Sequence, residues 1–494
     1  MQSLNKKKNS SERKLERERD KEMGRIASAL LLLVLALCCA VATVKGYNHH
    51  EGGEGGERRE RERMFLLRDM KRVVRTDAGE MKVVRSTHRW ISDWPNINVG
   101  FVTMEPNSLF IPQYLDSDLI LFIRRGEARV GSIYKDELIE KRLNCGDVYR
   151  IPAGSTFYLV NTADGQQLHV ICSIEKSDSI GWGTFQSFFI GGGSNPTSIL
   201  AGFERSTLST ALNVSESQVS QIMTRQKSGP IIPLSNSHSD SHPSRVWTQF
   251  LEMKHYERVQ CLKRMVQVHE EATEQGEELI MWSFKKLLGS VGKDEGRSSR
   301  PDSYNLFNRK PDFENDYGSS VVVDQSVYSP LRQSGVGLYL VNLTAGSMMA
   351  PHLNPTATEY GIVLRGSGRI QIVFPNGTLA MNAKVSEGDV FWIPRYFPFC
   401  QIASHSGPFE FFGFTTSARR NRPQFLVGSN SVLQSMKGPA LAAAFGVSEE
   451  RLERIVNAQS ESTILPSGSS EEEKVKNERI PAEPIWSFGF LSNK

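Results

Sequence analysis

Residue types that could carry chemistry are scattered along this 494-residue chain. The histidine-containing stretches 49–50 and 237–242 could bind a metal adventitiously, but their polar surroundings favour solvated linkers. The Asn-x-Ser/Thr triplets that begin at Asn213, Asn342 and Asn376 match the acceptor pattern for N-glycosylation. Asn376 lies in a predicted hairpin turn and Asn213 precedes a predicted helix cap, so these two are the candidate glycosylation sites. Asn342 adjoins a predicted strand, and we expect it to be buried.

The spacing of the six cysteines indicates neither a cysteine-rich metal site nor a network of disulfides. Two of them, Cys38 and Cys39, lie in an apolar N-terminal run. The others form no C-x-x-C pair, and a chain this long does not need covalent staples, so we expect at most one disulfide among Cys145, Cys172, Cys261 and Cys400. A net charge of +4 gives no reason to expect a nucleic-acid partner.

The N-terminus resembles a secretory signal. Residues 1–46 combine a polar, charged leader with the apolar run Ile26 to Val44, which ends among small residues. The rival interpretation is a single membrane anchor, because the run is near the minimum spanning length. Either Met1 or Met23 fits as the start. Residues 47–63 are rich in Gly, Glu and Arg and are predicted to be disordered, and the mature protein is expected not to span a membrane.

A sequence repeat organises the rest of the chain. Gly146 to Pro152 (GDVYRIP) returns as Gly388 to Pro394 (GDVFWIP), with five of seven positions identical. Ala211 to Pro233 likewise matches Ala444 to Pro466 without a gap. Two landmarks in the same order and at nearly the same offset predict a duplicated domain.

Each copy begins with short apolar runs separated by turn residues, a pattern typical of an antiparallel strand barrel. Each then continues into short helices that form a small arm. Ser215 followed by Gln218 is a capping-box pattern, and Gly446 is a predicted helix end. The predicted fold is therefore mainly β with helical arms. Its parts are a first barrel with its arm (64–233), a polar and partly helical linker (234–319), a second barrel with its arm (320–466) and a disordered tail (467–494).

A duplicated barrel with Gly-Asp-Val-x-x-Ile-Pro in each copy, followed by helical arms, resembles the bicupins, and in particular the vicilin or 7S globulin seed storage proteins. The resemblance implies two tandem jelly-roll barrels. It also implies subunits that clasp one another through their arms to form a homotrimer.

Enzymatic cupins hold a divalent metal with three histidines and one glutamate, so the resemblance identifies the positions to inspect. In the second copy His352 and Glu359 fall on ligand positions, but Asn354 replaces the second histidine and Phe399 the third. Imidazole and carboxylate suit copper or zinc, so a partial site at His352 and Glu359 stays open, with Cys400 as its third ligand. Side chains alternate along a strand, so Cys400 and Phe399 cannot both point inward.

In the first copy no ligand of this set remains. Gln113 and Tyr114 stand where histidines are expected, apolar residues around Ile120 replace the carboxylate, and Phe157 replaces the last histidine. We therefore predict a protein that is not an enzyme and has no cofactor.

The preferred function from sequence is a seed storage globulin, made in the secretory pathway and kept in protein storage vacuoles or outside the cell. The alternative is a vicilin-like protein that binds a small apolar ligand or sugar inside a barrel, lined by Phe157, Trp392 and Phe399.

Overall fold

The computed structural model describes residues 62–84, 97–134, 137–163, 165–175, 177, 185–234 and 303–468. The predicted signal, most of the predicted disordered stretch, Cys261, both histidine stretches and nearly all of the acidic tail lie outside these residues. Within the described part, no helix is both long and apolar enough to cross a membrane.

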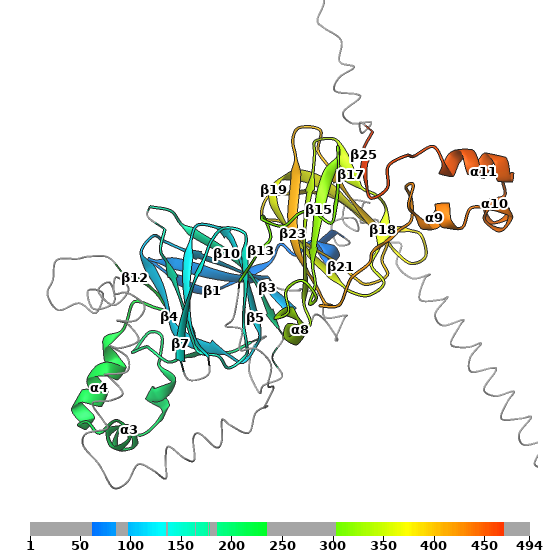
Figure 1. The fold of residues 1–494 in the computed structure, drawn as a ribbon. Helices are drawn as coiled ribbons and strands as arrows, with labels where there is room; N and C mark the ends of the chain where they lie inside the picture. The colour runs from blue at the N-terminus through cyan, green and yellow to red at the C-terminus, as the bar shows by residue number, and fades with distance from the viewer. Residues whose placement is uncertain are drawn as a thin grey trace, which may run out of the picture. The chain divides into compact units, whose positions relative to one another are not determined.

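The N-terminal module is a barrel of two antiparallel sheets (Figure 1). One sheet has the order β1-β2-β3-β10-β5-β8-β13, and the other has the order β11-β4-β9-β6-β7, with β12 beside β4. The strands are β1 (Met70–Thr76), β2 (Gly79–Val84), β3 (Ile97–Met104), β4 (Ser108–Leu115), β5 (Leu119–Arg125), β6 (Ala128–Tyr134), β7 (Glu137–Leu143), β8 (Asp147–Ile151), β9 (Phe157–Asn161), β10 (Leu168–Glu175), β11 (Ser187–Phe189), β12 (Ile231–Pro233) and β13 (Tyr304–Asn305).

The C-terminal module is built around one continuous sheet, because the 15-residue strand β19 takes part in both walls of the barrel. Its first half pairs with β21 and β23, and its second half pairs with β20 and β22. The strands are β14 (Phe313–Asn315), β15 (Gly318–Val323), β16 (Gly337–Leu343), β17 (Ser347–Met349), β18 (His352–Leu353), β19 (Glu359–Val373), β20 (Leu379–Ser386), β21 (Val390–Ile393), β22 (Phe399–Ala403), β23 (Phe409–Thr415), β24 (Gln424–Phe425) and β25 (Ile464–Pro466).

A helical arm follows each barrel, as the sequence predicts. Ser215 caps α4 and forms the full capping box with Gln218, and α10 ends at Gly446 with a positive φ of 65°. Ser448 caps α11 by accepting a hydrogen bond from the amide of Arg451. The helices are η2 (Ile199–Gly202), α3 (Arg205–Leu212), α4 (Glu216–Arg225), α8 (Leu331–Ser334), α9 (Val432–Ser435), α10 (Pro439–Phe445) and α11 (Glu449–Val456).

The repeated Gly-Asp-Val motif leads into β8 in one module and β21 in the other, and both strands contact segments from outside their own barrel: Arg150 of β8 donates to Gln333, and Val390 of β21 accepts from Leu67. The ring of Phe122 on β5 stacks on Phe412 of β23, with centroids 4.1 Å apart and planes at 13°. Both side chains are fully buried. The two modules therefore share one apolar seam in addition to the separate interior of the N-terminal barrel.

Each module also lends a segment to the other. The residues that lead into β1 cross to the C-terminal barrel, where the amide of Leu67 donates to the carbonyl of Val390 at 2.8 Å and Phe65 stacks on Trp392. In return, β13 pairs with β8 of the N-terminal barrel. The linker predicted over 234–319 thus differs from the structure at its end, since β13, β14 and the start of β15 lie within it.

Candidate functional site

The inherited ligand positions lie at one end of the C-terminal barrel, where β18 ends and β19 begins. His352 is on β18, Glu359 opens β19, and Asn354 lies in the loop between them. All three side chains are buried, with at most 6% of their surface exposed. The sequence alignment therefore identified three residues that face the protein interior and not solvent.

His352 is held as a neutral imidazole inside an aromatic cage. Its Nδ1 lies 2.7 Å from the carbonyl oxygen of Ala350, so Nδ1 carries the proton in this contact. The ring of Phe399 lies 4.0 Å from the imidazole, centroid to centroid, and that of Phe425 lies 5.1 Å away. Burial lowers the pKa of His352 from 6.5 to about 4, because these rings cannot solvate an imidazolium.

Glu359 is partnered by the residue that replaces the second histidine. Asn354 Nδ2 donates to Glu359 Oε1 at 2.7 Å, while Asn354 Oδ1 accepts from the amides of Thr356 and Ala357 at 3.0 Å. Burial raises the pKa of Glu359 from 4.5 to about 7, although the Asn354 hydrogen bond opposes the shift. Asn354 therefore holds the loop between β18 and β19 and provides a hydrogen-bond donor for the buried Glu359 carboxyl group. Both roles are structural.

Cys400 contacts neither His352 nor Glu359 through any hydrogen bond among the described residues. The sequence expectation that Phe399 and Cys400 point to opposite sides is confirmed, because Phe399 contacts His352 while the Cys400 thiol lies 3.6 Å from Gln371 Oε1. Burial raises the pKa of Cys400 to about 11, so the thiolate form is disfavoured. No three His, Cys, Asp or Glu side chains converge as a metal site anywhere in the described residues.

Aromatic side chains fill the interior beside Glu359. The ring of Phe391 lies where a side chain on Gly361 would be, 2.0 Å from an ideal Cβ, and Tyr339 covers Gly413 in the same way at 2.1 Å. Phe409 and Phe411 complete this fully buried group. The cupin metal does not fit these residues, because one ligand position holds a phenyl ring and another holds an amide already committed to two backbone amides and Glu359.

Metal analysis tests this directly. We expect less than about one tenth of an equivalent of copper, zinc or manganese in protein purified without a metal-affinity column, because two ligands bind such ions weakly. If the wild type held nearly one equivalent of metal and a His352→Phe variant lost it, the hypothesis of a partial metal site at His352 and Glu359 would be supported instead.

The described part of the N-terminal barrel contains a small cavity. Its volume is about 30 Å³, room for about two water molecules, and Phe157 and Gln113 are among the lining residues. Gln113 is 1% exposed, and its Oε1 has no hydrogen-bond partner among the described residues. The sequence expected Phe157, Trp392 and Phe399 to line a ligand cavity. Only Phe157 lines this one, since Trp392 stacks on Phe65, and Phe399 packs against His352 with the ring planes tilted by 51°.

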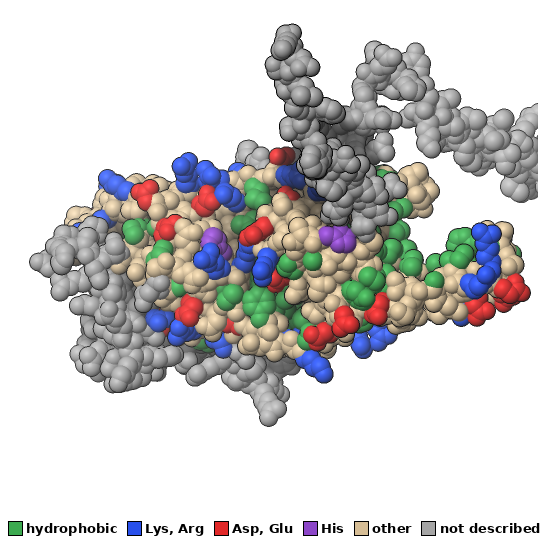
Figure 2. All heavy atoms as spheres, turned by 90° about the horizontal axis from the view of Figure 1, so that it is seen from above, with side chains coloured by type: hydrophobic (Ala, Val, Ile, Leu, Met, Phe, Trp, Pro, Cys, Tyr) green, Lys and Arg blue, Asp and Glu red, His purple; other side chains and the backbone are tan. Residues whose placement is uncertain are grey.

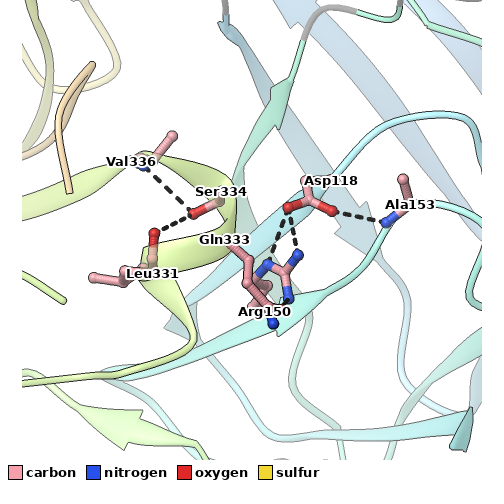
Figure 3. A network of polar contacts seen from close by, with 7 residues as sticks. All are labelled: Asp118, Arg150, Ala153, Leu331, Gln333, Ser334 and Val336. Atoms are coloured by element: carbon pink, nitrogen blue, oxygen red, sulfur yellow. Dashed lines mark hydrogen bonds and ion pairs between the residues drawn. The ribbon is translucent and has the colours of Figure 1, made fainter. Parts of the chain in front are cut away.

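A buried ion pair at the seam is the polar feature that sequence reasoning missed (Figure 3). Arg150 donates from Nε at 3.0 Å and from Nη2 at 2.6 Å to Asp118 Oδ2, and both side chains are less than a tenth exposed. Asp118 Oδ1 accepts from the amide of Ala153 at 2.8 Å, and Arg150 also donates to Gln333 of the other module. The pair thus fixes the turn after β8 and joins the two modules.

The candidate glycosylation residues are all exposed. Asn376 lies in the hairpin turn between β19 and β20, and Asn213 ends α3 with a left-handed φ of 51°. Asn342 was expected to be buried, and that expectation is wrong, because it is the one exposed position of β16. Glycosylation of Asn213 and Asn376 stays a prediction.

A cupin family model matches residues 65–219 and 304–453 of this chain. A vicilin-like seed storage protein of Arabidopsis thaliana is 52% identical over 412 residues, which is 82% of this chain and 80% of the relative. The chain belongs to the cupin family and to its vicilin-like seed storage proteins. A second vicilin-like seed storage protein of Arabidopsis thaliana is 32% identical, and the match spans 52% of that relative.

Solved vicilin structures share the fold. The structure of vicilin from hazelnut, Corylus avellana, is 21% identical with a TM-score of 0.65, covering 82% of this chain and 99% of that one. Vicilin from Capsicum annuum is 22% identical with the same TM-score, covering 82% of this chain and all of that one. The predicted bicupin fold of this vicilin-like chain is therefore confirmed.

Proposed function

We propose that this vicilin-like chain is a seed storage globulin, a nutrient reservoir and not a catalyst. The observation that carries the proposal is that both barrels are kept while the ligand positions of the cupin site are occupied by Asn354, Phe399 and packed rings. A storage protein needs a stable, dense fold and has no use for an open reactive centre. The name of the Arabidopsis relative supports the same role.

The place of accumulation tests this role. We expect the protein to be abundant in protein storage vacuoles of the mature seed and to be consumed during seedling growth, because a reserve is useful only when it is degraded. Quantitative immunoblotting of seed fractions through germination measures both quantities. A scarce protein that persists after germination would contradict storage.

The alternative of a small ligand inside a barrel has little support from the geometry. A cavity of about 30 Å³ holds about two waters and is far smaller than a drug-sized ligand site of about 300–1,000 Å³. The aromatic rings in the C-terminal barrel occupy the corresponding space there.

We further propose that the helical arms assemble the chain into a homotrimer. The C-terminal arm exposes Met436, Phe445 and Ile455, each about 60% accessible, and the N-terminal arm exposes Phe203 and Ile222. Figure 1 shows α10 and α11 extending away from the C-terminal barrel, and Figure 2 shows hydrophobic side chains on this projecting arm at the right. Large apolar side chains grouped on short helices are typical of protein contacts. Because the two arms differ, a contact of one arm with the other arm of a neighbour is head to tail, and it closes as a three-membered ring when successive chains are related by a rotation of about 120°.

Light scattering after size exclusion tests the assembly. We expect about three chains per particle, and a Phe445→Asp/Ile455→Asp variant should give monomers, because a charge on an apolar contact is costly to bury. Leu379→Asp is the matched control, since Leu379 is 52% exposed on β20, outside the arms. Monomeric wild-type protein at micromolar concentration would refute the arm contact.

A further inference from the structure

Four exposed arginines lie in the loops that follow β21 and β23, at the end of the C-terminal barrel where β19 begins. They are Arg395, Arg419, Arg420 and Arg422, and we call them the arginine rim. The loops that carry them are tied to the loop before β19. The amide of Arg395 donates to Thr358 Oγ1 at 3.3 Å, and the amide of Thr416 donates to the carbonyl of Thr358 at 3.0 Å.

A third hydrogen bond joins the same loops, because the hydroxyl of Thr356 donates to Oδ1 of Asn421, which lies between the last two arginines. The rim is therefore built on three adjacent strand ends and not on one loop. Strands lie about 4.8 Å apart, so the three strand ends extend about 10 Å across the barrel.

The rim carries almost uncompensated positive charge. The loops 354–358, 394–398 and 416–424 contain these four arginines and no Asp or Glu. Within the described residues, Arg395, Arg419 and Arg422 form no ion pair. Asp324 is the acidic group that interacts with Arg420. Burial opposes its ionisation, but hydrogen bonds from Ser326 and Val327 and the Arg420 charge together lower its pKa.

One arginine of the rim is already oriented. The guanidinium of Arg395 lies over the ring of Tyr396, 4.8 Å from its centroid. Tyr396 is 55% exposed and has a φ of 74°, which is costly for a bulky residue. Its amide donates to the carbonyl of Asn354 at 2.9 Å, which holds the strained turn in place. The stacked guanidinium loses less freedom when it binds an anion than a free side chain would.

We propose that the arginine rim binds a compact ligand that carries two or more phosphate groups. Guanidinium groups match phosphate oxygens with paired hydrogen bonds, and several arginines on loops that follow neighbouring strands suit linked phosphates better than a single phosphate. This binding goes beyond the storage role and does not depend on it, because it concerns an anion held on the surface of the folded protein.

Titration calorimetry with inorganic tripolyphosphate tests the proposal on the full chain at constant ionic strength near 0.15 M, where weak surface attraction is screened. We expect saturable binding to the wild type, and binding at least about tenfold weaker to an Arg419→Gln/Arg422→Gln variant. Orthophosphate should bind far more weakly than tripolyphosphate. Binding by citrate as tight as by tripolyphosphate would overturn the assignment to phosphate.

The control is a Lys71→Gln/Arg332→Gln variant, which removes two exposed charges outside the rim. It should bind tripolyphosphate like the wild type. Equal weakening in both double variants would show attraction by net charge alone and would overturn the site. Light scattering on the Arg419→Gln/Arg422→Gln variant provides the last check, because loss of assembly would identify the rim as a contact between copies of the chain, which also overturns the proposal.

Discussion

Replacing Asp118 with alanine is expected to lower the free energy of unfolding by about 3–5 kcal/mol. The change leaves the Arg150 guanidinium buried at the seam without its carboxylate, and it removes the acceptor for the amide of Ala153. The cost of an unpaired buried charge is much larger than the worth of an exposed ion pair, which is about 0–1 kcal/mol. Chemical unfolding at fixed protein concentration measures the change.

A double variant separates a buried-charge effect from a packing effect. Asp118→Leu/Arg150→Met removes both charges and keeps apolar volume at the seam, so it should recover most of the stability lost in Asp118→Ala. An exposed pair serves as comparison, since Arg142 and Glu127 also form an ion pair, and Glu127→Ala should cost less than about 1 kcal/mol. Equal losses in Asp118→Ala and Glu127→Ala would show that the seam pair is as well solvated as a surface pair.

The sequence was sufficient for the barrels and for the residue types at the inherited ligand positions, because both depend on local patterns. The Gly-Asp-Val motif predicts β8 and β21, and motif spacing identifies His352 and Phe399, whose rings are in contact, and the buried Glu359. The helix caps at Ser215 and Ser448 are likewise local.

Features that depend on contacts between distant residues were not predictable in this way. β13 is a two-residue strand, and its pairing with β8 crosses about 156 positions, so nothing in its own composition distinguishes it from a linker. Asp118 and Arg150 are 32 positions apart and match no motif. Asn342 interrupts a strand that is otherwise buried on both faces, and alternation gives no signal there.

His352 and Glu359 should make opposite contributions to the pH dependence of the free energy of unfolding. The folded pKa of Glu359, about 7, lies above its ordinary 4.5, so its contribution to stability is complete below about pH 4.5 and is lost as the pH rises toward 7. The folded pKa of His352, about 4, lies below its ordinary 6.5, so its contribution is complete above about pH 6.5 and is lost as the pH falls toward 4. Between about pH 4.5 and 6.5 the two slopes oppose each other and nearly cancel.

Removing one group should reveal the slope of the other. In Glu359→Gln, which keeps an acceptor for Asn354, stability should rise by roughly 3 kcal/mol from pH 4.5 to 6.5 relative to the wild type, because only the His352 term remains. In His352→Phe it should fall by roughly the same amount over that range. All other titrating groups are shared by the three proteins, so unfolding measured at both pH values isolates the pair. Parallel pH profiles in all three proteins would mean that neither side chain is held neutral in the fold. Slopes of opposite sign would show instead that the former ligand positions now hold two uncharged groups.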